Sequence, residues 1–537
     1  MTIYWYKCLH VPSTTSRCMA SETTPAIAAE GSSHRRFAVN VAASLGSLVI
    51  TLFVGLWYTP FMIRSLGVAV YGLVPLASSI TNYLTVITGS VCAMVARYIT
   101  TDLARNDVLN ANKHFNTFLI VGTLLAAALF VLAVVFSFFL PVFFNIPSGQ
   151  EHAAKSVFLG VAGAFLIYTI ANTFQSSIWV SNRFEIRAMI EAGSTLLRAG
   201  LILLSFRLWA PALWQVSIII PIVAAFVLLA DFVACRRLAP SLRVRASDFD
   251  RSKLPELLST SQWLFWGQLG NLLFLNIDLV LINILLGPLD SGRYAPLLQW
   301  VMLLRVVMSL IAGTLSPEIV VRYARHDTLG LLQLSRQAAK FLGLVVALPC
   351  GLLSGLGKPM LGTWLGPSFM DLAALSWLVL VPLAVEASQY HFASIMIAAN
   401  KLRVPALSIL AFGVGNAALA IVLTRYFHWG LYGVATASAI TSILRNGVFS
   451  PLYTAAVIDQ PWSTFLTKTG NALIACLLLA GTAAIVAEYV RPGSWIRLGV
   501  AAAPLALVYT GVMYFWGLDG DERITFQKIV LSSLRIR

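Results

Sequence analysis

Long apolar runs separated by short polar connections dominate the chain from about residue 37 onward. A bilayer core about 30 Å thick requires roughly 20 apolar residues in a spanning helix, and we count about fourteen runs of that kind. The predicted spans lie at roughly 37–62, 72–96, 115–140, 156–180, 188–206, 212–234, 259–286, 294–317, 341–357, 372–399, 404–424, 430–457, 470–488 and 498–517. The pattern predicts an all-α integral membrane protein with about fourteen transmembrane helices.

Composition agrees with this prediction and excludes several other classes. Of the 537 residues, 58% are apolar and 11% are charged, against about 25% charged in a typical soluble protein. A soluble enzyme, a disordered chain and a secreted disulfide scaffold are therefore excluded. The six cysteines are scattered and show no metal-binding or disulfide spacing.

The basic residues indicate the orientation of the helices. Lys and Arg number 37 and Asp and Glu number 22, which gives a net charge of +15. With the N-terminus in the cytoplasm, the cytoplasmic side carries about three times as many basic residues as the far side, as the positive-inside rule requires. This distribution favours a membrane over nucleic acid as the partner and predicts that both termini are cytoplasmic.

The densest basic cluster lies in the connection between the sixth and seventh predicted helices. It consists of Arg236, Arg237, Arg243, Arg245, Arg251 and Lys253. We interpret the cluster as a solvated loop that fixes topology, and a site for lipid headgroups is the alternative.

Two halves of the chain repeat the same landmarks. The first predicted helix ends in Leu66-Gly67 and the seventh in Leu286-Gly287; the helices that follow end near Arg97-Tyr98 and Arg322-Tyr323. Because each repeat holds six helices, both enter the membrane in the same direction, as in transporters that rock two bundles about a central site. The glycines are predicted to permit tight reversals at the far face.

The repeat sets the predicted domain boundaries. They are a disordered cytoplasmic tail (1–36), an N-terminal six-helix bundle (37–234), a basic linker (235–258), a C-terminal six-helix bundle (259–457), two extra helices (458–518) and a basic amphipathic tail on the inner leaflet (519–537).

The landmarks carry a family resemblance. The pattern of Leu-Gly, short turn, Tyr and a long uncharged helix ending in Arg-Tyr, twice repeated and followed by two helices, resembles the polysaccharide transporter family. The segment from Asn276-Ile277-Asp278-Leu279 to Leu286-Gly287 is similar to the seventh helix of that family. The family includes the O-antigen flippases and belongs to the multidrug, oligosaccharidyl-lipid and polysaccharide (MOP) exporter superfamily.

The resemblance implies a MATE-like fold and a cargo. The cargo would be a polyprenyl-diphosphate-linked oligosaccharide, turned from the inner to the outer leaflet of a bacterial inner membrane for lipopolysaccharide or exopolysaccharide synthesis. A polysaccharide polymerase and co-polymerase would be its candidate partners.

Three arginines lie near the middle of predicted helices, where a charge costs roughly 2.5–3.5 kcal/mol unless it faces a cavity or a partner. They are Arg198, Arg305 and Arg445. Because cations from both repeats fall at about the same depth, we predict a shared positive cavity that binds the substrate. The planar guanidinium suits a diphosphate since it donates paired hydrogen bonds and stays charged.

Four acids also fall within predicted helices: Glu191, Asp231, Asp278 and Glu386. Each is a candidate counter-ion, and Asp278 or Glu386 is the candidate site for Na⁺ or H⁺ coupling. Glu191 is predicted to share a polar stripe with Arg198, two turns away. His391 lies just beyond Glu386 and is read either as a hydrogen-bonded interior residue or as part of a proton relay.

Tyr71, Tyr294 and Trp57 are predicted to form part of the aromatic belt at the outer interface, with stacking on sugar as the alternative.

Three other functions compete with a flippase. A multidrug exporter of the same superfamily would use Na⁺ or proton exchange, but its cavity should be acidic. A membrane glycan polymerase or ligase would need a larger far-side loop than residues 141–155 provide, so the sequence predicts a protein that is not an enzyme and has no cofactor beyond a coupling ion. A scaffold for glycan assembly predicts that neutralising the three arginines leaves export intact.

Overall fold

The computed structural model describes residues 26–105, 107–517 and 523, and all regular secondary structure in these ranges is helical. Helix α1 (Ala26–Leu66) begins within the segment predicted as a disordered tail. The segment Ala26–Glu30 (AIAAE) is rich in strong helix formers, which favours extension of the helix toward the N-terminus. The predicted C-terminal tail lies, apart from Arg523, outside the described residues.

The predicted fold class is confirmed. Among the described residues, 12 helices have the length and apolarity to cross a membrane. Helix α2 (Val68–Ala104) and the continuous run from α14 to α15 (Leu431–Val457) occupy the two remaining predicted spans. The protein is thus a multi-pass membrane protein with about fourteen spans.

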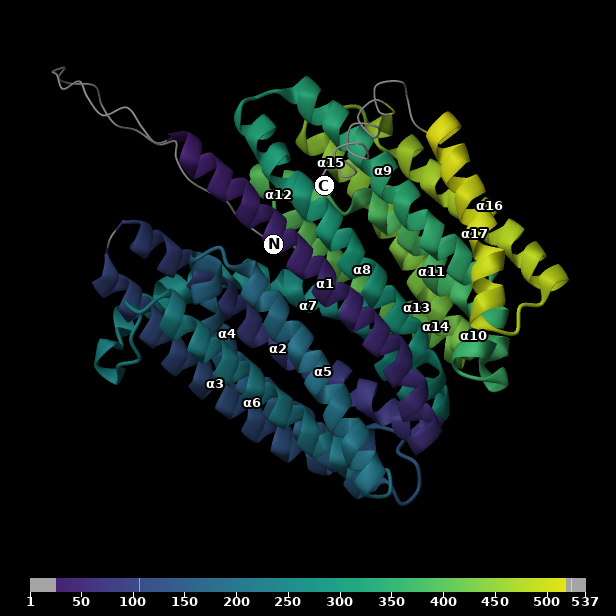
Figure 1. Cartoon of the computed structure of the whole chain (residues 1–537), viewed down its shortest axis with the longest axis horizontal. Helices are drawn as coiled ribbons and strands as arrows, with labels where there is room; N and C mark the ends of the chain where they lie inside the picture. Colours follow the sequence, from purple (N-terminus) through teal and green to yellow (C-terminus); the bar gives the residue numbers. More distant parts are fainter. Residues whose placement is uncertain (1–25, 106, 518–522, 524–537) are drawn as a thin grey trace.

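The chain forms two lobes, each containing one repeat (Figure 1). The N-terminal lobe contains α1, α2, α3 (Val108–Phe143), α4 (Glu151–Val180), α5 (Phe184–Leu208) and α6 (Leu213–Leu238). Two short 3₁₀ turns, η1 (Ala246–Asp248) and η2 (Arg251–Lys253), lead from α6 to the second lobe.

The C-terminal lobe repeats this arrangement with more interruptions. It contains α7 (Leu254–Leu286), α8 (Pro288–Ala324), α9 (Thr328–Gly355), α10 (Gly357–Trp364), η3 (Pro367–Leu372), α11 (Ala373–Gln389), α12 (Phe392–Ala398), α13 (Arg403–Arg425), α14 (Leu431–Ser442), the π-helix η4 (Ile443–Phe449) and α15 (Ser450–Val457). The tenth predicted span is therefore broken between α11 and α12, and the twelfth has a π-helical centre.

The predicted glycine turns are confirmed in both repeats. Gly67 joins α1 to α2 at a φ of 84°, and Gly287 joins α7 to α8 at a φ of 104°. Residues with a Cβ rarely adopt these left-handed values, so glycine lets each helix pair reverse within a single residue.

The two lobes join at the end that holds these turns. One hydrophobic core there contains Met62 and Tyr71 from the N-terminal lobe together with Leu297 and Trp300 from α8. At the opposite end, each lobe has a core of its own, one around Phe115 and the other built from C-terminal residues alone. The lobes are therefore held together at one end of the molecule, the predicted far face.

Backbone contact between α2 and α8 closes this junction. A Cβ on Gly72 would lie 2.8 Å from the Gly292 Cα, and a Cβ on Gly292 would lie 2.1 Å from the Val68 carbonyl oxygen. Gly72 and Gly292 occupy equivalent positions, since each is the fifth residue after its turn glycine. Helices α2 and α8 thus cross on the pseudo-symmetry axis of the repeat. Only glycine lets their backbones come this close.

Hydrogen bonds between the lobes also stabilise the end of the molecule that holds the glycine turns. Asn145 and Asn283 exchange hydrogen bonds of 3.0 and 3.2 Å between backbone and side chain. Thr59 donates to Gln299 at 2.5 Å, and the Trp364 indole donates to the Leu56 carbonyl at 2.6 Å.

The last two helices pack on the outside of the C-terminal lobe. They are α16 (Leu466–Val490) and α17 (Trp495–Val512), and α16 lies along α9 (Figure 1). Gly343, Gly351 and Gly355 permit this packing, because a Cβ on Gly355 would lie 2.4 Å from the Ala480 carbonyl oxygen.

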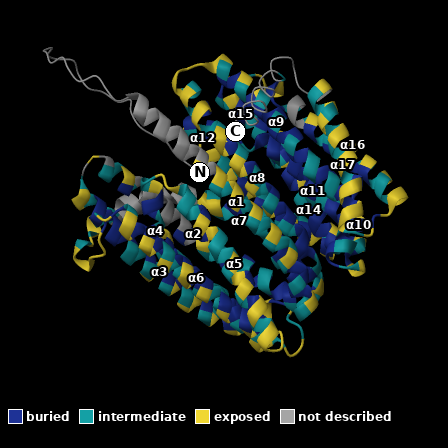
Figure 2. Ribbon diagram, viewed as in Figure 1, coloured by how far each residue is buried: buried dark blue, intermediate teal, exposed yellow. Residues whose placement is uncertain are grey.

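Exposed residues lie along the outside of the helices (Figure 2), and many of them are large and apolar. Leu124, Phe138 and Val142 of α3 are at least 66% exposed, as expected for side chains that contact lipid.

The aromatic belt was predicted wrongly for both tyrosines. Tyr71 and Tyr294 are 8% and 1% exposed. Tyr71 lies in the core shared by the two lobes, and Tyr294 points into the C-terminal lobe, where its hydroxyl donates to Asp278. Trp57 is 41% exposed and stacks on Phe61, in keeping with a lipid-facing position.

Candidate functional site

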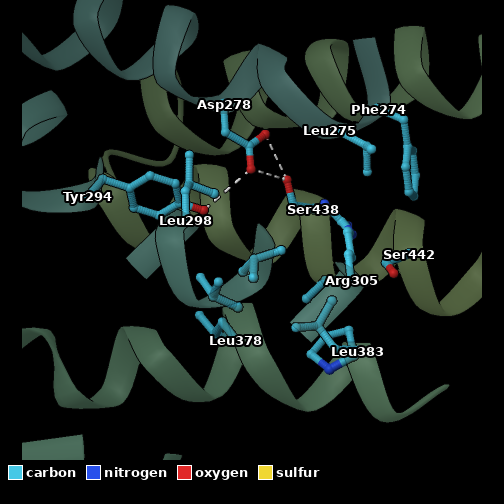
Figure 3. A pocket seen from close by; sticks show the side chains of 14 residues that line it. Phe274, Leu275, Asp278, Tyr294, Leu298, Arg305, Leu378, Leu383, Ser438 and Ser442 are labelled. Atoms are coloured by element: carbon cyan, nitrogen blue, oxygen red, sulfur yellow. Dashed lines mark hydrogen bonds between the residues drawn. The ribbon is translucent and has the colours of Figure 1, made fainter. Parts of the chain in front are cut away.

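A small pocket inside the C-terminal lobe is lined by two of the charged residues predicted in that half, Asp278 and Arg305 (Figure 3). It lies between α7, α8, α11 and α14, and its polar lining comes from Asp278, Tyr294, Arg305, Ser438 and Ser442. The pocket leaves about 50 Å³ of free volume, enough for about three water molecules. It accommodates water or an ion but not a sugar ring.

Asp278 on α7 is the carboxylate of this pocket. It is 6% exposed and accepts hydrogen bonds from Ser438 at 2.8 and 2.9 Å, Asn416 at 3.2 Å and Tyr294 at 3.3 Å. The Asn416 side-chain oxygen in turn lies 3.2 Å from the Ser438 hydroxyl. Three helices thus surround one carboxylate with neutral polar groups, and the oxygens of Asp278, Asn416 and Ser438 are the donor type that Na⁺ and other hard cations prefer.

Arg305 on α8 pairs with Glu386 on α11. The Nε and one terminal nitrogen of Arg305 donate to the two carboxylate oxygens at 2.8 and 3.0 Å. Both side chains are largely buried, with 15% and 12% exposed. This bidentate geometry is among the strongest of charge-assisted hydrogen bonds and leaves the other terminal nitrogen of Arg305 outside the pair.

Arg445 lies in the π-helix of the same lobe, within electrostatic range of Arg305 and Glu386. It donates to Asn446 at 2.6 Å, and its guanidinium stands 5.4 Å from the centre of the Phe274 ring. Its Nε is buried and has no hydrogen-bond partner among the described residues. π-helical turns occur frequently at functional sites.

The charges of this cluster sum to zero when Asp278 is ionised. Arg305 and Arg445 carry two positive charges, Glu386 neutralises one of them, and ionised Asp278 offsets the other. A cation or proton on Asp278 would therefore leave the cluster with one uncompensated positive charge.

Arg198 stands apart from this cluster, on α5 of the N-terminal lobe. It is exposed and lies within electrostatic range of the Tyr58 and Tyr168 hydroxyls. Within the described ranges it has no carboxylate partner. The structure thus brings four of the five predicted site residues together and places the fifth in the facing lobe.

The acids of the N-terminal lobe pair with an arginine that the sequence reading had not selected. Arg187 lies 2.7 Å from Glu191 and 3.8 Å from fully buried Asp231. Glu191 therefore forms its ion pair with Arg187, one helical turn earlier.

His391 is fully buried between α11 and α12. The ring packs edge-on against Phe392, and the backbone of Ser335 lies near it. The interpretation of His391 as an interior residue is confirmed by its burial.

Sequence reasoning missed the neutral partners of Asp278. Asn416 is a polar residue within an apolar span, a signal that identifies it as a candidate. Ser438 and Tyr294 carry no such signal, because serine and tyrosine are common in transmembrane helices.

The class of protein follows from comparison with solved structures. An inward-facing MATE family multidrug resistance transporter of the MOP superfamily superimposes with a TM-score of 0.59 at 14% identity, covering 77% of this chain and 98% of the other. The lipid II flippase MurJ, in an inward closed conformation, gives a TM-score of 0.59 at 16% identity, covering 88% and 98%. A MATE multidrug transporter, DinF-BH, gives 0.54 at 16% identity over 80% and 96%. The protein has the fold of the MOP-superfamily transporters.

The family follows from a sequence relative. The "Uncharacterized membrane protein EpsK" of Bacillus subtilis (strain 168) is 30% identical over 501 residues, which cover 93% of this chain and 98% of EpsK. The chain belongs to the same family as EpsK. No protein-family model matches the sequence.

Proposed function

We propose that the protein is a flippase that carries a polyprenyl-diphosphate-linked oligosaccharide from the inner to the outer leaflet of a bacterial inner membrane. The resemblance to polysaccharide transporters supports the cargo, and the fold shared with MurJ supports translocation of a large lipid-linked molecule. A polysaccharide polymerase and co-polymerase are the proposed partners of this step, and both termini are proposed to be cytoplasmic.

One observation carries the proposal: arginines without full compensation occupy both lobes. Arg445 has an unsatisfied buried N–H, Arg305 has a terminal nitrogen outside its ion pair, and Arg198 in the facing lobe has no carboxylate partner among the described residues. A diphosphate between the lobes would supply the missing anion. The glycan would occupy the space between the lobes, and the polyprenyl tail would remain in lipid.

Alternating access would proceed by separation of the lobes at the glycine crossing. In the present structure the lobes share a core at the predicted far face and have separate cores at the other end. Loading from the cytoplasmic side and release at the far side would require the shared core and the Asn145–Asn283 contact to open.

Charge balance suggests how an ion would drive this cycle. Na⁺ or a proton at Asp278 would remove the negative charge that offsets the second arginine, and would thereby strengthen binding of an anionic headgroup. Release of the ion would reverse the effect. Vesicles with imposed Na⁺ or pH gradients test the coupling, and transport indifferent to both gradients would contradict it.

The deciding experiment is reconstitution with labelled lipid-linked oligosaccharide and measurement of its passage between leaflets. We expect Arg305→Ala to abolish transport with the protein still inserted, and Arg305→Lys to retain part of it, because lysine keeps the charge but not the fork. Wild-type transport by Arg305→Ala would refute the role of this residue.

A multidrug exporter is the second candidate, favoured by the two carboxylates of the C-terminal lobe and by the fold of the MATE transporters. Uptake of a cationic dye distinguishes the two functions. The flippase proposal predicts dye accumulation no faster than in vesicles without protein.

A further inference from the structure

The basic connection between α6 and α7 is held in one conformation by α3. We call residues 239–253 the docked connector. The Asn112 side chain donates to the Ser241 carbonyl at 2.9 Å and accepts from the Arg243 amide at 2.7 Å. Asn116 repeats the pattern one turn later, donating to the Arg243 carbonyl and accepting from the Arg245 amide, each at 2.8 Å. Two side-chain amides therefore take the place of a neighbouring strand.

The residues that make these hydrogen bonds are buried. Asn112 and Asn116 are 8% and 1% exposed, and Leu242 is 2% exposed in a core with Phe115 and Phe118. Breaking such a contact would leave a buried amide unsatisfied, which is costly.

The far part of the connector is fixed as well. The Asp250 amide donates to the Thr117 hydroxyl at 2.9 Å, and the Lys113 ammonium lies 3.3 Å from the Asp250 carboxylate.

The outer side of the docked connector combines basic and apolar groups. Arg243, Arg245 and Arg251 are exposed, as are Arg236 and Arg237 at the end of α6. Among them, Val244 and Phe249 are 53% and 40% exposed.

The depth of the docked connector matches the membrane surface. It packs on the first turns of α3, which are polar through Asn116 and become apolar from Phe118. The remaining helix to Phe143 is about 39 Å long, enough to cross the hydrocarbon core. In Figure 1 the connector lies at the end of the N-terminal lobe beside α3.

We propose that the docked connector is a binding site for anionic phospholipids of the cytoplasmic leaflet. The arginines would bind headgroup phosphates, and Val244 and Phe249 would insert at the boundary between headgroups and acyl chains. A loop that only fixes topology needs positive charge but no fixed backbone. The buried amides of Asn112 and Asn116 hold the backbone of Arg243 and Arg245 in one conformation, so both side chains start from fixed positions at the surface.

The test uses the full-length protein with an environment-sensitive fluorophore on Ser247→Cys, in a background in which Cys8, Cys18 and Cys92 are replaced by serine and the three remaining cysteines are buried. The protein is reconstituted into phosphatidylcholine vesicles with increasing fractions of phosphatidylglycerol. We expect a saturable change in fluorescence at low phosphatidylglycerol, and none with inorganic phosphate or glycerophosphate. No change with phosphatidylglycerol would overturn the proposal in favour of an acidic protein partner.

Two variants test whether binding depends on the fixed backbone of the connector or only on its positive charge. Arg243→Ala/Arg245→Ala should raise the phosphatidylglycerol requirement roughly 30-fold. Asn112→Ala/Asn116→Ala keeps every charge but releases the backbone, and it should also lose saturable binding.

Arg325→Ala/Arg336→Ala is the matched control, because it removes two exposed charges from the same membrane face on the other lobe and should bind like the wild type. Equal weakening by this control would overturn the proposal, as would normal binding by the asparagine variant. Should the asparagine variant fail to fold, Thr117→Val, which loosens the contact with Asp250, provides the same comparison.

Discussion

Arg305 and Glu386 form one ion pair, in which the proposed role in transport must be separated from a structural role. Both are largely buried, and the bidentate contact satisfies two nitrogens and two oxygens. Removal of one partner leaves a buried charge without compensation, whereas removal of both leaves only a cavity. A loss of transport in Arg305→Ala alone could therefore arise from instability.

A double substitution separates these effects. Arg305→Ala should lower the free energy of unfolding by about 3–5 kcal/mol, and Arg305→Ala/Glu386→Ala should recover part of that loss without recovering transport. Thermal unfolding in detergent and flipping in vesicles measure the two properties. Transport by the stable double variant would show that Arg305 is needed only to compensate Glu386.

Asp278 shows how neutral groups position an acid. Its partners Ser438, Asn416 and Tyr294 come from three different helices. We expect Asp278→Asn to abolish any dependence of transport on a Na⁺ or pH gradient, because the side chain loses the charge that a cation or proton would neutralise. Transport that still responds to either gradient in this variant would place the coupling elsewhere.

At the scale of elements, one contact between the docked connector and α3 depends on a carboxylate, that of Asp250 with Lys113. Hydrogen bonds from Ser252, followed by the contact with Lys113, lower the pKa of Asp250 from 3.8 to about 2. Because the pKa is lower in the folded state, the ionised form stabilises docking. This stabilisation is complete above about pH 4 and is lost as the pH falls toward 2.

The connector should therefore remain docked from pH 7 to pH 4.5 and loosen between pH 4 and 2. The mobility of a nitroxide on Ser247→Cys, measured by electron paramagnetic resonance, reports this change. In Asp250→Asn the mobility should no longer vary over that range. A transition near pH 6 would indicate that another group controls docking.

At the scale of the whole molecule, the glycine crossing sets how closely the lobes approach. A methyl group on Gly292 would collide with the Val68 carbonyl, a backbone atom that cannot move aside without its helix. Gly313 on the same helix has open space around it. The two glycines thus provide a matched pair for testing closure at the predicted far face.

Gly292→Ala should hold the lobes apart at this end and slow transport. Cysteines at Thr59 and Gln299, whose side chains are hydrogen-bonded in the present structure, should cross-link readily in the parent protein. We expect cross-linking to fall severalfold with Gly292→Ala and to stay unchanged with Gly313→Ala. Unchanged cross-linking with Gly292→Ala would mean that the crossing does not limit closure.

The sequence by itself determined the membrane architecture. About fourteen apolar runs, a repeat and two turn glycines fix spans and reversals, because each depends on local composition or on backbone conformation at one residue. The same reasoning selected Asp278, Arg305, Glu386 and Arg445, since charges are rare in lipid and stand out in any apolar run.

Only the tertiary structure decided which of these charges meet. Ion pairing depends on helix rotation and packing, so Arg305 pairs with Glu386 across 81 positions while Arg198 remains in the facing lobe. Tyr71 and Tyr294 are residues of a type common in aromatic belts, but both are buried, because helix packing places Tyr71 in the core shared by the lobes and Tyr294 beside Asp278. The docked connector was visible in sequence as charge alone; its fixed backbone required Asn112 and Asn116 to be brought to it by the fold.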